Sequence, residues 1–315
     1  MFTPPSQATM KVLLSLGFVA SLSLSVQAQT IDDAIMLRGR ELQTGNLYSH
    51  DSWDQYWEGT VKRTNGNIGR ITTDANVVTA NYGLNDRLNV IAMVPYVWTN
   101  ASQGVLHGIQ GFQDLTLAAK WNFLDKPWTS HGALKAFLVV SGGLPMTDYN
   151  PELLPLSIGM GSTRVSWRGT LNFQSNPGWF LTSTTAYAWR SEVELDRPYF
   201  FTDGEFVMSD QVDMPNVFDT TASAGYMGKG GLMTAVSFTK QNTLGGGDIR
   251  RQDMPFLSNS MDFFRVGAMV MHPIPKLAPL AFHVALGHTF DGRNVGESTT
   301  VTFGLLYTFN GRPTP

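Results

Sequence analysis

Short segments in which apolar and polar residues alternate constrain the fold of this chain more than any other feature. In residues 111–123, GFQDLTLAAKWNF, every second position from residue 115 onward is apolar: Leu115, Leu117, Ala119, Trp121 and Phe123. The intervening positions are mainly polar: Asp114, Thr116, Lys120 and Asn122. A period of two over this length predicts a strand with two different faces rather than a helix.

Similar segments recur along most of the chain and predict an all-β fold of about twelve strands. We expect strands at residues 53–63, 69–82, 88–98, 111–123, 132–141, 164–174, 179–195, 217–227, 232–243, 261–271, 280–290 and 298–309.

The connections between these segments alternate in length. From the second strand onward, short connections such as 83–87 and 175–178 mostly alternate with long ones such as 144–163 and 196–216. This sorting is typical of an up-and-down transmembrane β-barrel, which has tight turns in the periplasm and longer loops outside the cell. The short first connection, 64–67, is an exception. The alternative is a secreted β-sandwich, which has no reason to sort its loops in this way.

A strand can cross hydrocarbon only within a closed sheet, so the apolar faces should contact lipid and the polar faces should line the lumen. The charged residues that this places in the lumen, our candidate pore-lining residues, are Asp114, Lys120, Lys135, Arg168, Arg190 and Arg265. These charges could pair across a filled barrel and hold it rigid. Alternatively, they could form a cationic lining that favours anionic or aromatic solutes.

The N-terminus resembles an export signal. Met10-Lys11 precedes an apolar run, 12–26, and Val26-Gln27-Ala28 resembles a cleavage site. We therefore expect a signal peptide at residues 1–28, with residues 1–9 as an extension upstream of Met10. The alternative, a membrane anchor, needs a longer apolar run.

The signal peptide sets the expected organisation of the rest of the chain. A periplasmic lead-in at residues 29–52 should be followed by an outer-membrane barrel at 53–309. Residues 310–315 should form a periplasmic tail.

Composition excludes several classes of function. The net charge of −3 argues against a nucleic-acid partner. The absence of cysteine excludes disulfides and thiolate chemistry.

Three segments resemble a known family. They are YGLNDRLNV at 82–90, VPY at 94–96 and GFQDLTLAAK at 111–120. In this order they are similar to the outer-membrane proteins grouped with the MetA pathway of phenol degradation, whose pattern is YGLTDRLNVG, VPY and GLGDLTLGAKY. Gln113 replaces a glycine of that pattern. The resemblance implies a barrel of about twelve strands that lets hydrophobic or aromatic solutes cross the outer membrane by passive diffusion.

Two other functions stay open: an outer-membrane lipid hydrolase, and a structural or adhesive barrel that acts through its external loops. The hydrolase hypothesis rests on His50-Asp51-Ser52, which resembles the His-x-Ser of outer-membrane phospholipase A, with Asn65 as an orienting group. Because we place this triplet before the first strand, a solvated lead-in is the simpler interpretation, and we predict that the chain is not an enzyme. The histidines lack metal-ligand spacing, and no cofactor is indicated.

The expected partners are outer-membrane lipid, a small solute, and the barrel-assembly machinery during biogenesis. The aromatic end Tyr307-Thr308-Phe309 resembles the signal by which that machinery recognises barrels. A final strand with ordinary aromatic belt residues would have the same sequence.

Overall fold

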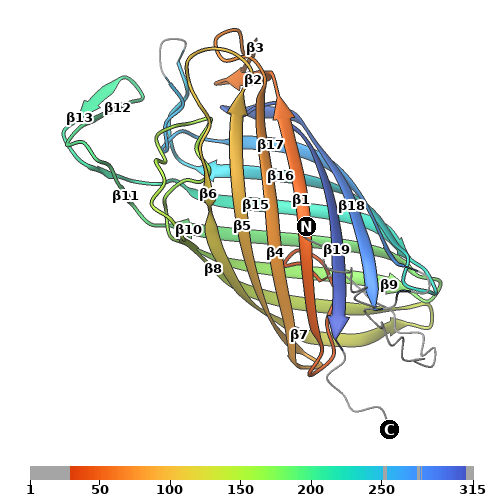
Figure 1. Cartoon of the computed structure of the whole chain (residues 1–315). Coiled ribbons are helices and arrows are strands. Elements are labelled where there is room, and N and C mark those ends of the chain that lie inside the picture. The colour runs from red at the N-terminus through yellow and green to blue at the C-terminus, as the bar shows by residue number, and fades with distance from the viewer. Residues whose placement is uncertain (1–28, 251–253, 275–276, 278, 310–315) are drawn as a thin grey trace, which may run out of the picture.

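The computed structural model of the chain is a closed barrel of twelve antiparallel strands (Figure 1). It describes residues 29–250, 254–274, 277 and 279–309, so the predicted signal peptide and tail lie outside the described residues. The wall strands are β1 (Leu42–Trp53), β4 (Ile71–Asn85), β5 (Leu88–Ala101), β7 (Asp114–Thr129), β8 (Gly132–Pro145), β9 (Arg164–Ser175), β10 (Trp179–Arg190), β15 (Asn216–Met227), β16 (Met233–Leu244), β17 (Asp262–Pro273), β18 (Leu280–Arg293) and β19 (Thr299–Phe309). Pairing of β1 with both β4 and β19 closes the sheet.

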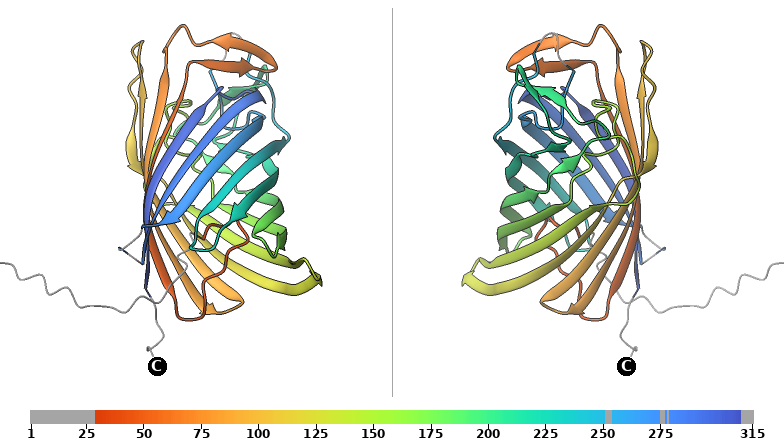
Figure 2. Two further views of the ribbon diagram at one scale, coloured as in Figure 1. Left: turned by 90° about the vertical axis from the view of Figure 1, so that its right-hand side faces the viewer. Right: turned by 90° about the vertical axis from the view of Figure 1, so that its left-hand side faces the viewer.

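Short strands lie within the long connections, all at one end of the barrel. They are β2 (Gln55–Glu58) and β3 (Val61–Thr64), β6 (Gln110–Phe112), β11 (Val193–Glu194), β12 (Phe200–Thr202), β13 (Glu205–Val207) and β14 (Gln211–Val212). Figure 2 shows the orange β2–β3 hairpin at one end of the barrel, and Figure 1 shows that β19 finishes at the other end and that β12 and β13 reach away from the wall. We call this end extracellular and the end with the tight turns periplasmic, as in outer-membrane barrels.

The two faces of the wall follow the alternation in the sequence. On β7, Leu117 and Trp121 are 51% and 50% exposed on the outside, whereas Lys120 between them is fully buried in the lumen. On β19, the outward row ends in Tyr307 and Phe309, whose ring centroids are 4.5 Å apart. The apolar faces are therefore external, as lipid requires.

The first wall strand differs from the prediction. It is β1, residues 42–53, and not 53–63, which instead form most of the β2–β3 hairpin. The predicted lead-in at 29–52 is therefore wrong from residue 42 onward. The reason is that β1 has polar side chains on its outward face, including Asn46, Tyr48 and His50, so no apolar row identifies it as a strand.

Placing β1 correctly also explains the exceptional short connection. The turn at residues 64–67 lies within the extracellular region between β1 and β4, which as a whole spans residues 54–70. Trp57 on β2 is buried, and its backbone N–H donates to the Val295 carbonyl at 2.9 Å. The hairpin is thus attached to the connection between β18 and β19.

Among the described residues, no helix is long and apolar enough to cross a membrane.

Candidate functional site

The segment before β1, residues 29–41, lies inside the lower part of the barrel, where it appears in red in Figure 2. Gln29 is only 4% exposed, and its backbone N–H donates to Gln43 Oε1 at 3.1 Å. The Asn81 side-chain amide donates to the Gln29 carbonyl at 2.8 Å. These bonds fix the segment against the inner faces of β1 and β4.

Two adjacent carboxylates attach the segment to two further wall strands, β7 and β9. Lys120 Nζ on β7 donates to Asp33 Oδ1 at 2.7 Å and to the Thr30 carbonyl at 2.8 Å. Arg168 Nε on β9 lies 2.9 Å from Asp32 Oδ1, and a second nitrogen of the same guanidinium lies 3.9 Å from Asp219 on β15. A fully buried ammonium is costly without an anionic partner, so the lumen depends on the segment for charge balance.

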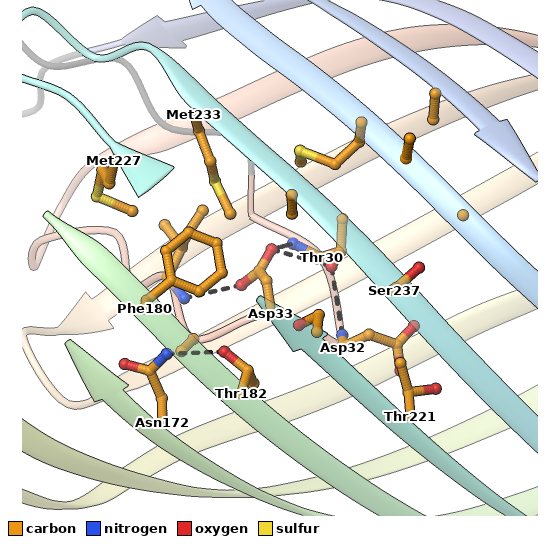
Figure 3. Close-up of a pocket in the computed structure, with 18 of the residues that line it drawn as sticks. Thr30, Asp32, Asp33, Asn172, Phe180, Thr182, Thr221, Met227, Met233 and Ser237 are labelled. Carbon is orange, nitrogen blue, oxygen red and sulfur yellow. Dashed lines mark hydrogen bonds between the residues drawn. The ribbon is translucent and has the colours of Figure 1, made fainter. Parts of the chain in front are cut away.

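A cavity of about 310 Å³ lies beside this segment (Figure 3). Its apolar wall is formed mainly by Ile35, Phe180, Met227, Met233, Ala235 and Met269. Its polar wall contains Asp32, Asp33, Asn172, Thr182 and Thr221, and Asn172 Nδ2 donates to Thr182 Oγ1 at 2.7 Å. Methionine side chains are unbranched and polarizable, so they adapt to ligands of different shape and contact aromatic rings favourably.

The size of this cavity indicates what it can hold. An apolar cavity of about 150 Å³ in another protein is large enough to bind benzene. The cavity here is about twice that size and has a polar side. It can therefore hold a single-ring solute with one or two polar substituents.

The six residues predicted to line the lumen do not form one site. Lys120 and Arg168 contact the N-terminal segment, as described above. The other three basic residues are spread along the barrel. Lys135 Nζ lies 3.9 Å from Asp125 Oδ2. Arg265 is 3.9 Å from Asp51 and donates to Ser298 Oγ at 2.8 Å. Arg190 is at the extracellular end of β10, next to Arg164 in the β9–β10 ladder.

Asp114, the predicted acidic residue, belongs to an external loop contact. Its carboxylate accepts a hydrogen bond from the Tyr149 hydroxyl at 2.8 Å, and the Gly161 N–H donates to the same hydroxyl at 3.0 Å. Burial raises the pKa of Tyr149 above its ordinary value, so the phenol stays protonated. This contact holds the connection between β8 and β9 against the start of β7.

The His50-Asp51-Ser52 triplet lies on β1 and not in a solvated lead-in. His50 is on the outside of the wall, where its Nδ1 is 2.8 Å from Asp74 Oδ1, and Tyr48 donates to the same oxygen at 2.6 Å. Asp51 instead accepts a bond from Thr300 inside the lumen. Within the described part of the chain, Ser52 Oγ makes no hydrogen bond to His50, and Asn65 directly follows β3, outside the wall strands. The triplet is thus divided between the two faces of the wall.

Sequence reasoning missed the contribution of Asp32 and Asp33. Both lie in a segment without periodicity, which we interpreted as a lead-in to the barrel. The available signal was the excess of basic over acidic residues among the predicted lumen positions. Such an excess requires carboxylates from some other part of the chain.

Comparison with known proteins now identifies the family. Residues 58–305 match the family model described as "Putative MetA-pathway of phenol degradation". The chain belongs to this family. The match covers all of the barrel wall except β1 and the end of β19. No curated protein sequence matches the chain.

Several solved structures are similar to the chain. An outer-membrane channel from Pseudomonas putida F1 is 16% identical, with a TM-score of 0.68, over 90% of this chain and 100% of that chain. The β domain of the Bordetella autotransporter BrkA is 12% identical, with a TM-score of 0.48, over 86% and 100% of the two chains. The transport unit of the autotransporter AIDA-I from Escherichia coli is 10% identical, with a TM-score of 0.48, over 90% and 93%. The first match shows that the chain has the fold of an outer-membrane channel.

Proposed function

We propose that the chain is exported by its signal peptide to the outer membrane, where it forms a passive channel for small hydrophobic or aromatic solutes. The observation that carries this proposal is the lumenal cavity lined by Phe180 and three methionines beside the N-terminal segment. A barrel with a purely mechanical role would gain stability by filling that space.

The family and the fold both support a channel. The MetA family is described by a pathway that degrades phenol, and the Pseudomonas putida protein with this fold is an outer-membrane channel. The cavity matches such solutes in chemistry, because its apolar wall suits an aromatic ring and its hydroxyl and amide groups suit a phenolic oxygen. The channel needs no catalytic residue.

The N-terminal segment narrows the path through the barrel. It lies in the lumen and contacts β1 and β4 through Gln29, β7 through Asp33 and β9 through Asp32. A solute must pass beside it, and the cavity provides the space next to it. The channel should therefore be selective for small molecules, with low conductance for ions.

Reconstitution of the purified barrel tests the proposal. In planar bilayers we expect discrete, small single-channel steps, and in proteoliposomes we expect phenol to enter faster than in protein-free liposomes. Heat-denatured protein is the control. If the folded barrel gives neither conductance nor phenol entry, the channel function is wrong.

A further inference from the structure

Arg190 differs from the other basic residues predicted to line the lumen. Lys120, Lys135, Arg168 and Arg265 each have a carboxylate oxygen within 4 Å. Within the described residues, Arg190 has no carboxylate at ion-pair distance, and neither does Arg164. These two arginines are directly opposite each other in the β9–β10 ladder.

The ladder places both side chains on the lumenal face. Arg164 and Arg168 are four positions apart on β9, so their side chains point to the same face of the sheet. Arg168 contacts Asp32 inside the barrel, so this face is the lumenal one. Arg190 shares this face because it is the cross-strand partner of Arg164. Two like charges directly opposite each other in a sheet are destabilising. The pair therefore needs a negative counter-charge. No carboxylate in the described part of the chain lies close enough to form an ion pair with it.

The backbone holds this pair in place. The Arg190 N–H donates to Asn216 Oδ1 at 3.0 Å, and the next residue, Ser191, donates to the Thr163 carbonyl at 2.9 Å. Arg164 lies over Gly143 on β8, where an added Cβ would be 3.7 Å from its Nε. The backbone at Arg190 is thus held by hydrogen bonds, and the Arg164 side chain packs against β8.

Acidic residues near the pair do not neutralise it. Arg190 borders an extracellular vestibule of about 1080 Å³ that also contains Glu192, Asp203 and Asp213. None of these carboxylates lies within 4 Å of the Arg190 guanidinium, and Asp203 is 3.4 Å from Arg250 instead. Asp219 interacts electrostatically with Arg164, but it lies deeper in the lumen, where it is 3.9 Å from Arg168 and beyond ion-pair distance of Arg164.

We propose that Arg164 and Arg190 bind the carboxylate of a small organic anion at the extracellular mouth of the barrel. The planar fork of a guanidinium matches the two oxygens of a carboxylate, and two such groups side by side can hold one anion from both sides. The occupant supplies the missing negative charge. As a selectivity device the site rests on the proposed channel function, because a solute held at the mouth must then pass the lumenal cavity.

Equilibrium binding to the folded barrel in detergent tests the site without requiring transport. Isothermal titration calorimetry at pH 7 would compare benzoate, which is ionised, with benzyl alcohol, which has a similar shape and no charge. Since hydrogen bonds to charged groups contribute about 1.5 to 3 kcal/mol, we expect benzoate to bind about tenfold or more tightly. The preference should weaken as salt is added.

Matched variants assign the effect to the pair. Arg190→Gln and, separately, Arg164→Gln should each remove most of the preference for benzoate. Arg87→Gln, which changes an exposed arginine at the periplasmic turn between β4 and β5, should keep it. Equal binding of the two ligands by the unmodified barrel, or an unchanged preference in both lumenal variants, would overturn the site. Preferential benzoate binding by a barrel that neither conducts nor admits phenol would refute the channel but not the site.

Discussion

Lys120 Nζ lies 2.7 Å from Asp33 Oδ1, and this ion pair joins residues that are 87 positions apart in the sequence. Lys120 is fully buried, whereas Asp33 belongs to the segment that precedes the first wall strand. The pair therefore connects the barrel wall to the element that narrows its lumen.

Replacing Asp33 with Asn should release the segment. The change leaves a buried cation without its partner, which costs about 3 to 5 kcal/mol. Withdrawal of the segment relieves this cost, because Lys120 then regains water. We expect higher single-channel conductance and faster proteolysis within residues 29–41. Asp210→Asn, at an exposed position in the extracellular connection between β13 and β14, is the control and should leave both properties unchanged. If conductance does not change in Asp33→Asn, the segment does not limit flux.

Filling the cavity should slow solute entry. Ala235 lines the cavity, so Ala235→Trp places an indole in the space that we assign to the solute. Ala222, on the lipid face of β15, offers a matched control for the same change. We expect phenol entry into proteoliposomes to fall in Ala235→Trp and to stay at the unmodified rate in Ala222→Trp. Equal rates in the two variants would place the solute path elsewhere.

Truncating Phe180 should have the opposite effect on the cavity. Phe180 is 8% exposed and packs with Ile35 and Met233. Phe180→Ala removes a buried ring, which costs about 3 to 5 kcal/mol of stability, and leaves more space beside the segment. We expect a lower midpoint of chemical unfolding together with entry of larger aromatic solutes. A smaller range of admitted solutes would contradict the assigned role of Phe180.

Removing one hydroxyl should loosen the connection between β8 and β9. Tyr149→Phe deletes the group that donates to Asp114 and accepts from the Gly161 N–H. Each lost hydrogen bond costs about 1 kcal/mol, and the groups left unpaired add to this cost. Hydrogen exchange at Gly161 should become faster. Exchange there should be unaffected in Tyr199→Phe, since Tyr199 is an exposed residue of another loop.

Acid should open a contact between the extracellular connection that follows β16 and the end of β18. Arg293 donates to both Asp248 carboxylate oxygens, at 2.6 and 2.9 Å, and these bonds lower the pKa of Asp248 below its ordinary value of 3.8. A lowered pKa means that the contact stabilises the folded state above pH 3.8 and is lost as the pH falls through the lower value of the folded protein. Proteolysis of residues 245–250 should therefore increase on acidification. In Asp248→Asn it should be fast at every pH.

The strands of the wall could be predicted from sequence wherever an apolar row faces lipid. Leu117 and Trp121 on β7, and Tyr307 on β19, show this clearly. β1 could not be predicted, because the outward Tyr48 and His50 bond to Asp74 on the neighbouring strand rather than presenting an apolar row. Such a face shows no period of two in hydrophobicity.

The lumenal site was less predictable than the wall. Alternation identified Lys120 and Arg168 as lumenal, but it gave no information about which residues they contact. Asp32 and Asp33 reach them from a segment with no regular structure, so their positions depend on tertiary contacts alone. The cavity beside the segment depends on the same contacts.

The central claim is that the apolar face of the wall contacts lipid and the polar face lines the lumen. Because the chain has no cysteine, single spin labels can be attached at Leu171→Cys, on the outer face of β9, and at Thr221→Cys, which borders the cavity. In reconstituted membranes, the collision rates of each label with oxygen and with a water-soluble nickel complex should be measured by electron paramagnetic resonance. We predict that the label at 171 is accessible to oxygen but not to nickel, and that the label at 221 has the greater relative accessibility to nickel. A label at 171 that is as accessible to nickel as the one at 221 would contradict the account.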